Sequence, residues 1–274
     1  MSSWLTKTKD YPDKLQDWNA EQKRELWNVM AEFVDNEVNP FVRNLVHEWC
    51  YTNNPNMLTY ELEYMSDIGI YEGKKHYATH KIFDEGDPVD YIKWSGIELK
   101  KAQVPKEMKA FLKDIYEGTI LKKWKNDDYV SYVNNLYDKF KQFTIDELSF
   151  WKGYNTERQS VGFLQMQVGT TGIAKACTYY NQILQKLNLS KKYDELRVGD
   201  KVRFCYIDEG NPYKINCIAY KPGQWPSEFA KMFKPDYKKM FDKLILDPLK
   251  RFREATKFES IDPSKQVVQD IFNL

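Results

Sequence analysis

Two adjacent lysines, Lys74 and Lys75, have the residue type and setting that suit contact with a nucleic acid. They follow Gly73 and precede a stretch in which Tyr77 and Lys81 alternate with other residues, as in a strand. A lysine held on a stiff hairpin can enter the minor groove, where every Watson–Crick pair offers acceptors in similar places. It would then contact a duplex without reading its sequence. Considered alone, adjacent lysines are more often a solvated surface feature.

Carboxylates at Glu61 and Glu63 are two residues apart, which predicts that they share one face of a strand. Such a pair invites a metal hypothesis, although a solvated strand face is the more common explanation of this spacing. Phosphoryl transfer by two metal ions needs carboxylates that bridge both ions. The sequence has no strand-turn-strand pattern with paired aspartates, and the acidic run at 84–87 lacks the spacing of a calcium loop.

The segment 169–175 approaches a predicted helix through glycine and threonine, and a helix amino end can hold a phosphate through its backbone amides. It is not a Walker loop, because the Gly-Lys-Ser/Thr ending is absent. Core packing and helix capping explain its composition adequately.

The elements around the lysines begin with an apolar period of three and four over residues 20–50, which predicts a helix that Pro40 kinks or divides. From Met57 the period changes to two, which predicts a half-buried strand. Residues 73–96 are expected to form a hairpin with an acidic turn, and Pro105 is placed to open a helix. This combination of predicted helices and antiparallel strands indicates an α+β fold.

The rest of the chain is predicted to be mainly helical with a small strand insertion. Apolar stripes predict helices near 129–140 and 173–184, and Thr144 with Glu147 has the form of a capping box. Two short strands are predicted at 202–207 and 215–219, and two helices separated by Pro235 and Asp236 follow them.

Composition limits the possible classes of function. The chain has 274 residues, 42% of them hydrophobic, and 41 Lys and Arg against 40 Asp and Glu, so a nucleic-acid site requires local clustering of lysines. The four cysteines lie far apart and suggest neither zinc nor disulfides. No run has the length of a membrane span. We therefore expect a soluble, intracellular protein without a membrane partner.

The lysine hairpin, together with the Glu-Gly-Asn-Pro run at 209–212, resembles the lysine-tyrosine hairpin and thumb of family B DNA polymerases of T-even-type phages. The resemblance implies the C-terminal part of such an enzyme, from a split polymerase gene. Residues 1–107 would be a partial palm with the DNA-contacting hairpin, 108–262 a mainly helical thumb, and 263–274 a tail that binds the sliding clamp. His76 departs from the family pattern, which usually has another basic residue there.

The resemblance also implies residue roles. Lys75 would contact the minor groove, Lys74 a neighbouring phosphate, and Tyr77 would orient the hairpin, while Glu63 would be a supporting carboxylate and not the main metal ligand. The further DNA contacts implied are Lys93, Lys100, Lys101, Lys175, Asn181 and Asn211. The clamp contacts implied are Val268, Ile271, Phe272 and Leu274. A frayed end of a core helix is the plainer interpretation of this tail.

Several partners follow from the same resemblance. A separate N-terminal polymerase chain would supply the exonuclease domain, the fingers and the rest of the palm. Its aspartates would be the main ligands of the catalytic magnesium. Primer-template DNA and the sliding clamp complete the set, in the cytoplasm of a phage-infected bacterium. The separated palm would expose apolar surface around Trp4, Leu5, Trp27 and the first long helix.

Two other classes of function remain open on the sequence. One is a non-catalytic, duplex-binding accessory protein tethered to the clamp. The other is a protein scaffold whose lysines only confer solubility, which predicts negligible affinity for DNA even at low salt.

Overall fold

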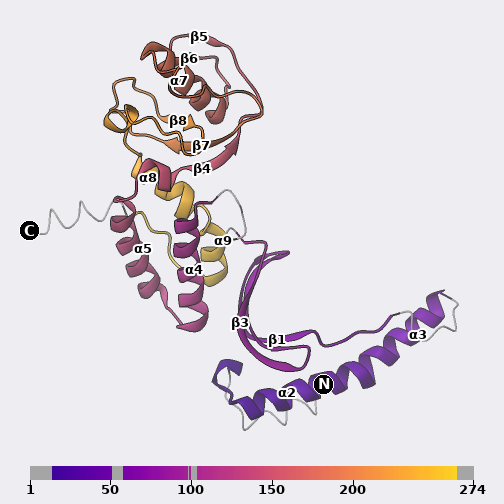
Figure 1. The fold of residues 1–274 in the computed structure, drawn as a ribbon. Helices are drawn as coiled ribbons and strands as arrows, with labels where there is room; N and C mark the ends of the chain where they lie inside the picture. Colours follow the sequence, from indigo (N-terminus) through magenta and orange to yellow (C-terminus); the bar gives the residue numbers. More distant parts are fainter. Residues whose placement is uncertain (1–13, 51–57, 98, 100–103, 264–274) are drawn as a thin grey trace, which may run out of the picture. The chain divides into compact units, whose positions relative to one another are not determined.

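The computed structural model describes residues 14–50, 58–97, 99 and 104–263, and it divides the chain into two compact units, Met1–Gly96 and Ile97–Leu274 (Figure 1). Both units combine helices with antiparallel strands, so the predicted α+β class is confirmed. The units separate after Gly96, whereas the sequence predicts the domain boundary at residue 107. In the described ranges, no helix combines the length and the apolar character needed to cross a bilayer.

The first unit begins with a single-turn helix, η2 (Leu15–Asp17), and continues into a long helix in three parts. These parts are α2 (Ala20–Phe33), the π-helical turn η3 (Val34–Val38) and α3 (Asn39–Cys50). Asn19 and Gln22 form a capping box at the start of α2. The π turn ends two residues before Pro40, which has no N–H to donate to the helix. The predicted helix with an interruption near the proline is therefore confirmed.

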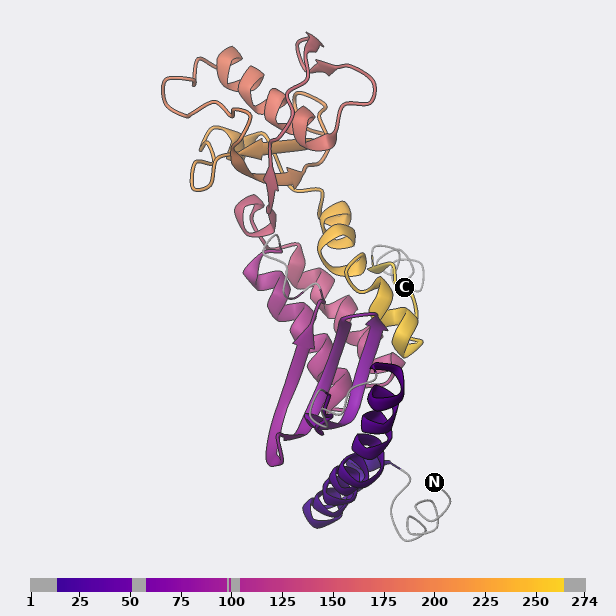
Figure 2. The ribbon, with the colours of Figure 1, turned by 90° about the vertical axis from the view of Figure 1, so that its right-hand side faces the viewer.

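Three antiparallel strands follow in the order β1-β2-β3, with β1 at Tyr64–Gly73, β2 at His76–Asp84 and β3 at Asp87–Ser95. They lie side by side in Figure 2. Glu85 and Gly86 join β2 to β3, both with positive φ (50° and 90°), as a tight hairpin turn with the twist of the strands requires. The predicted hairpin is confirmed.

The strand predicted from Met57 is wrong for residues 58–63, which have no strand partner in the structure, while Met57 lies outside the described residues. The buried side chain of Asn39 holds this segment instead. Its amide donates to the carbonyl of Tyr60 at 3.0 Å and its oxygen accepts from the Tyr60 N–H at 2.7 Å. Polar side-chain contacts therefore replace the ladder that alternation predicted.

The core of the first unit lies where α2 meets the β2–β3 end of the sheet. Trp27 stacks on Phe83 with ring centroids 5.4 Å apart, and Ile82 is buried beside them. An irregularity in the β2–β3 register between Lys81 and Phe83 allows both neighbours, Ile82 and Phe83, to be buried. Trp27 is thus a core residue, and its predicted place on an apolar surface is wrong.

The predicted apolar surface on the first long helix does exist on α3. Phe41 and Trp49 are 63% and 79% exposed. Trp4 and Leu5, assigned to the same surface, lie outside the described residues.

The second unit contains helices and three short antiparallel pairings. Its helices are α4 (Lys106–Leu121), α5 (Asn126–Phe140), α6 (Ile145–Leu148), α7 (Gly172–Lys186), η5 (Phe229–Lys231), α8 (Tyr237–Phe241), η6 (Asp242–Leu246) and α9 (Lys250–Thr256). Its strands are β4 (Phe150–Gly153), β5 (Ser160–Gly162), β6 (Gln165–Met166), β7 (Lys201–Tyr206) and β8 (Cys217–Tyr220). The main sheet has the order β4-β7-β8, and α7 packs against β8.

Most predicted elements of the second unit are confirmed. The apolar stripes of α5 and α7 are buried, and Thr144 and Glu147 form the capping box of α6. Strands β7 and β8 occupy the two predicted strand positions. Strand β4 is not predicted by the sequence pattern; it begins one residue beyond α6, after Ser149, and its Trp151 and Lys152 pair with Arg203 and Val202 of β7.

Candidate nucleic-acid interface

The two lysines form the turn between β1 and β2, and their side chains are exposed. Lys75 has a φ of 62°, the left-handed conformation that a tight turn requires. Its backbone carbonyl accepts a hydrogen bond from the hydroxyl of Ser95 at 3.2 Å, and the Lys74 carbonyl lies 2.8 Å from Nδ1 of His76. The backbone of the turn is therefore fixed while both ammonium groups remain free to reach a ligand.

The end of β3 passes directly beside this turn. Gly96 has a φ of 61°, and a Cβ built on it would lie 2.1 Å from the carbonyl oxygen of Lys75. No side chain fits in that space without moving the turn. Glycine at this position thus allows β3 to close against the lysines.

Tyrosine and lysine side chains gather on the three-stranded sheet below the turn. Tyr71 and Tyr77 are cross-strand partners with ring centroids 5.8 Å apart. The ammonium groups of Lys81 and Lys93 lie 4.3 Å and 4.5 Å from the ring centroid of Tyr64, within the range of cation–π attraction. The sheet therefore packs two lysine side chains against one tyrosine ring, with Lys81 buried and the Lys93 side chain 33% exposed.

Acidic groups neutralise the lysines of the sheet. Lys81 pairs with Asp84 at 2.7 Å, and Lys93 pairs with Glu63 at 3.4 Å. Burial alone would lower the pKa of Lys81, but hydrogen bonds to Asp84 and Tyr91 outweigh burial, so the pKa is raised and the side chain stays charged. Residues 74 and 75, by contrast, have no acidic partner within the described ranges, so this turn offers unneutralised positive charge.

Glu63 is the carboxylate partner of Lys93, and its side chain is 67% exposed. Among the residues the structure describes, no three His, Cys, Asp or Glu side chains come together as a metal site. Cys177, Cys205 and Cys217 are buried free thiols, and burial raises the pKa of Cys217 to about 11, so that thiol remains protonated. The supporting role of Glu63 and magnesium binding by a partner chain stay predictions.

Two of the predicted DNA contacts are engaged inside the second unit. The Asn181 amide donates to the Leu196 carbonyl at 2.9 Å and accepts from the Leu196 N–H at 2.8 Å. The Asn211 amide donates to the carbonyls of Asp208 and Ile215 at 2.6 Å and 2.7 Å, and it is 7% exposed. The geometry gives both side chains a role in holding loops.

The remaining predicted contacts fall in two groups. Lys175 lies in the first turn of α7 and is partly buried. The others lie outside the described residues: Lys100, Lys101, Val268, Ile271, Phe272 and Leu274.

Two features of the site were missed in the sequence. Tyr71 and Tyr77 are equally spaced on either side of residue 74, which is a signal for cross-strand pairing across a turn there. The second feature is His80, which bridges the strands through Asp67 at 2.7 Å and Asp90 at 2.6 Å. These three residues have no recognisable spacing in the sequence.

A scan against protein-family models found no matching family, and a search of curated proteins found no match. The chain's own residues and their geometry therefore carry the functional proposal.

Proposed function

We propose that this chain is the C-terminal part, a partial palm and a thumb, of a family B DNA polymerase whose catalytic aspartates are on a separate chain. The observation that carries the proposal is the turn of Lys74 and Lys75, exposed and free of acidic partners in the described ranges, beside the Tyr71 and Tyr77 rings. In this proposal the turn grips primer-template DNA.

The geometry of the turn suits a contact that is independent of sequence. Phosphate contacts position a protein on a duplex, and a lysine in the minor groove meets acceptors common to all base pairs. The contacts from Ser95 and His76 fix the turn backbone, which reduces the conformational freedom lost on binding.

Holding the duplex positions the primer hydroxyl for attack on a bound nucleotide. The partner chain would contribute its aspartates and most of the magnesium ligands, and two such ions would stabilise the attacking and leaving oxygens. Alone, the chain would bind DNA without extending it. Residues 263–274, of which 264–274 lie outside the described ranges, would tether the assembly to a sliding clamp.

A primer-extension assay tests the proposal. The chain is mixed with the product of its neighbouring gene, and each is also assayed alone with magnesium and all four nucleotides. We expect extension from the mixture only, and a decrease when both turn lysines are replaced by glutamine. Failure of the mixture to extend a primer would contradict the polymerase proposal, and duplex binding that persists in that case would support an accessory protein.

A further inference from the structure

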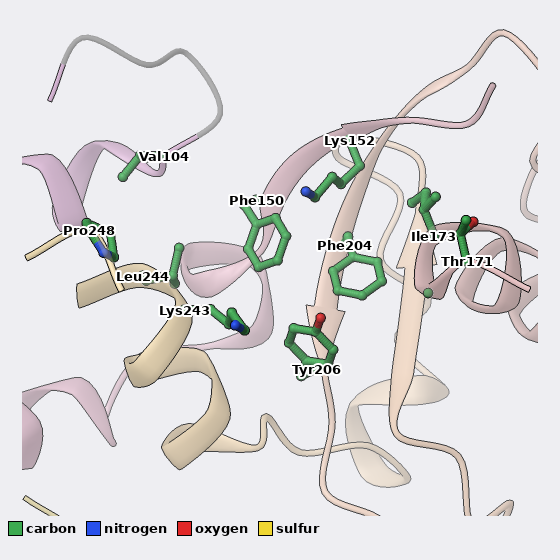
Figure 3. A pocket seen from close by; sticks show the side chains of 11 residues that line it. Val104, Phe150, Lys152, Thr171, Ile173, Phe204, Tyr206, Lys243, Leu244 and Pro248 are labelled. Atoms are coloured by element: carbon green, nitrogen blue, oxygen red, sulfur yellow. The ribbon is translucent and has the colours of Figure 1, made fainter. Parts of the chain in front are cut away.

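A hollow of about 430 Å³ lies in the second unit, between the β4–β7 sheet, the first turn of α7 and the η6 turn. Figure 3 shows its aromatic rings in the middle, with Thr171 and Ile173 on one side and Leu244 and Pro248 on the other. Its volume falls within the range of about 300–1,000 Å³ that is usual for small-molecule sites.

Three rings from neighbouring strands form the wall of this hollow. Phe150 on β4 lies opposite Phe204 on β7, with ring centroids 5.2 Å apart, and Tyr206 lies two residues further along the same face of β7. Tyr206 is 5.0 Å from Phe204 and 6.4 Å from Phe150. Phe204 is 3% exposed and forms the floor, whereas Phe150 and Tyr206 are partly exposed. Such a wall suits stacking of a planar, aromatic ligand.

Positive charge lies at the edge of the aromatic wall. Lys152 projects over the hollow with its ammonium group 5.2 Å from the Phe150 ring centroid, and it has no acidic partner within the described residues. Lys243 also lines the hollow, but its ammonium group is 2.7 Å from a carboxylate oxygen of Asp247. Lys152 therefore supplies the unneutralised charge, which favours an anionic ligand.

The start of α7 adds hydrogen-bond donors on the same side. The first four N–H groups of a helix have no acceptor within the helix. The Thr171 hydroxyl accepts from Ala174 N–H, and the Thr171 carbonyl accepts from Lys175 N–H. In the described part of the chain, the N–H groups of Gly172 and Ile173 have no acceptor, so they are free for a ligand oxygen.

The position of Gly172 leaves this space open. A Cβ built on Gly172 would meet only the Phe204 ring, at an ordinary contact distance of 4.0 Å. A larger side chain at this position would therefore extend into the hollow with little cost to the surrounding packing.

We propose that this hollow binds one unpaired nucleotide. Its base stacks against Phe150 and Tyr206, and its phosphate lies between Lys152 and the free N–H groups of α7. The nucleotide is either free in solution or part of a single DNA strand, because both present the same base and phosphate. This site goes beyond the proposed duplex grip, to which the Lys74 and Lys75 turn belongs.

Two probes distinguish the sources. Calorimetry measures binding of free dAMP, and fluorescence anisotropy measures binding of a labelled single-stranded pentanucleotide. Binding of dAMP identifies the free nucleotide as sufficient, whereas binding of the pentanucleotide alone identifies the strand. Binding of neither probe at millimolar concentration overturns the proposal.

The variants Gly172→Val and Lys152→Gln test the location, and Lys201→Gln on the adjacent strand is the matched control because Lys201 does not line the hollow. We expect each test variant to weaken binding of the competent probe about tenfold, with duplex affinity and thermal unfolding unchanged. If Gly172→Val does not fold, probe binding by Lys152→Gln alone tests the location of the site. Wild-type binding by a folded test variant, or equal loss of duplex binding, would overturn the proposal without affecting the lysine turn.

Discussion

Gly96 and Lys75 are so close that a methyl group on Gly96 would clash with the turn: its Cβ would lie 2.1 Å from the Lys75 carbonyl oxygen. Real Cβ atoms do not approach an oxygen so closely, and a φ of 61° adds backbone strain for any other residue. The end of β3 therefore determines where the lysine turn lies. The position of the proposed DNA contact therefore depends on a glycine at the far end of the three-stranded sheet's sequence.

The first prediction concerns this glycine. Gly96→Ala must push the lysine turn away from β3, so we expect duplex affinity to fall about tenfold, or about 1.4 kcal/mol. The measurement is fluorescence anisotropy with a labelled primer-template. Gly223→Ala is the matched control, because Gly223 has a similar φ of 72° but nothing within 4 Å of its added Cβ. Equal affinities of the two variants would show that the turn position is irrelevant to binding.

The second prediction concerns the bridge formed by His80 with Asp67 and Asp90. Burial alone would lower the pKa of His80, but hydrogen bonds to Asp90 and Asp67 and the charges of both carboxylates outweigh it, so the pKa is raised. Because the folded pKa exceeds the unfolded one, the stabilisation is complete below about pH 6.5 and is lost as pH rises through the folded value.

Thermal unfolding and hydrogen exchange of β1–β3 at several pH values measure this effect. We expect His80→Gln to destabilise the first unit by about 1–3 kcal/mol at acidic pH, and by less at alkaline pH. His47→Gln on the exposed face of α3 is the control and should keep the wild-type pH dependence. A His80→Gln variant with the same pH dependence as wild type would refute the bridge.

The third prediction concerns Asn211, whose side chain both donates to and accepts from the backbone of its own loop. Its oxygen also accepts from the N–H groups of Tyr213 and Ile215 at 3.0 Å and 3.4 Å. Asn211→Ala leaves these buried groups unpaired, and we expect a loss of at least about 2 kcal/mol in the free energy of unfolding. Denaturant unfolding measures it, with the exposed Asn135→Ala as control.

Duplex affinity of folded Asn211→Ala separates two roles. An unchanged affinity means that the residue only holds the loop, as its hydrogen bonds indicate. A folded variant with normal stability but weakened DNA binding would instead support the contact expected from the family resemblance.

Local signals made the hairpin and the helices predictable. Glycine and acidic residues between alternating segments specify the β2–β3 turn, and the apolar stripes of α5 and α7 specify their buried faces. The strand expected at 58–63 had the same alternation and failed, because the Asn39 side chain occupies the backbone groups of Tyr60. Alternation indicates which side chains would share one face of a strand, but it does not show whether another strand is present to pair with it.

The site was predictable only in part for the same reason. Lys74 and Lys75 could be placed on a turn from their neighbours. The pairing of Lys93 with Glu63 and the stacking of lysines on Tyr64 depend on register between strands, which the sequence does not display. Asn181 and Asn211 looked available in the sequence, but the amide of Asn181 is bonded to Leu196 and that of Asn211 to the backbone of its own loop.

The most direct measurement of the central claim is the affinity of the whole chain for labelled primer-template DNA at several salt concentrations, for wild type, Lys74→Gln, Lys75→Gln and the exposed control Lys191→Gln. The account predicts binding that falls steeply with salt. Lys74→Gln should reduce the slope by about 1, as loss of one phosphate contact requires, and Lys75→Gln should weaken binding about equally on every sequence. No binding at the lowest salt, or turn variants indistinguishable from Lys191→Gln, would contradict the account.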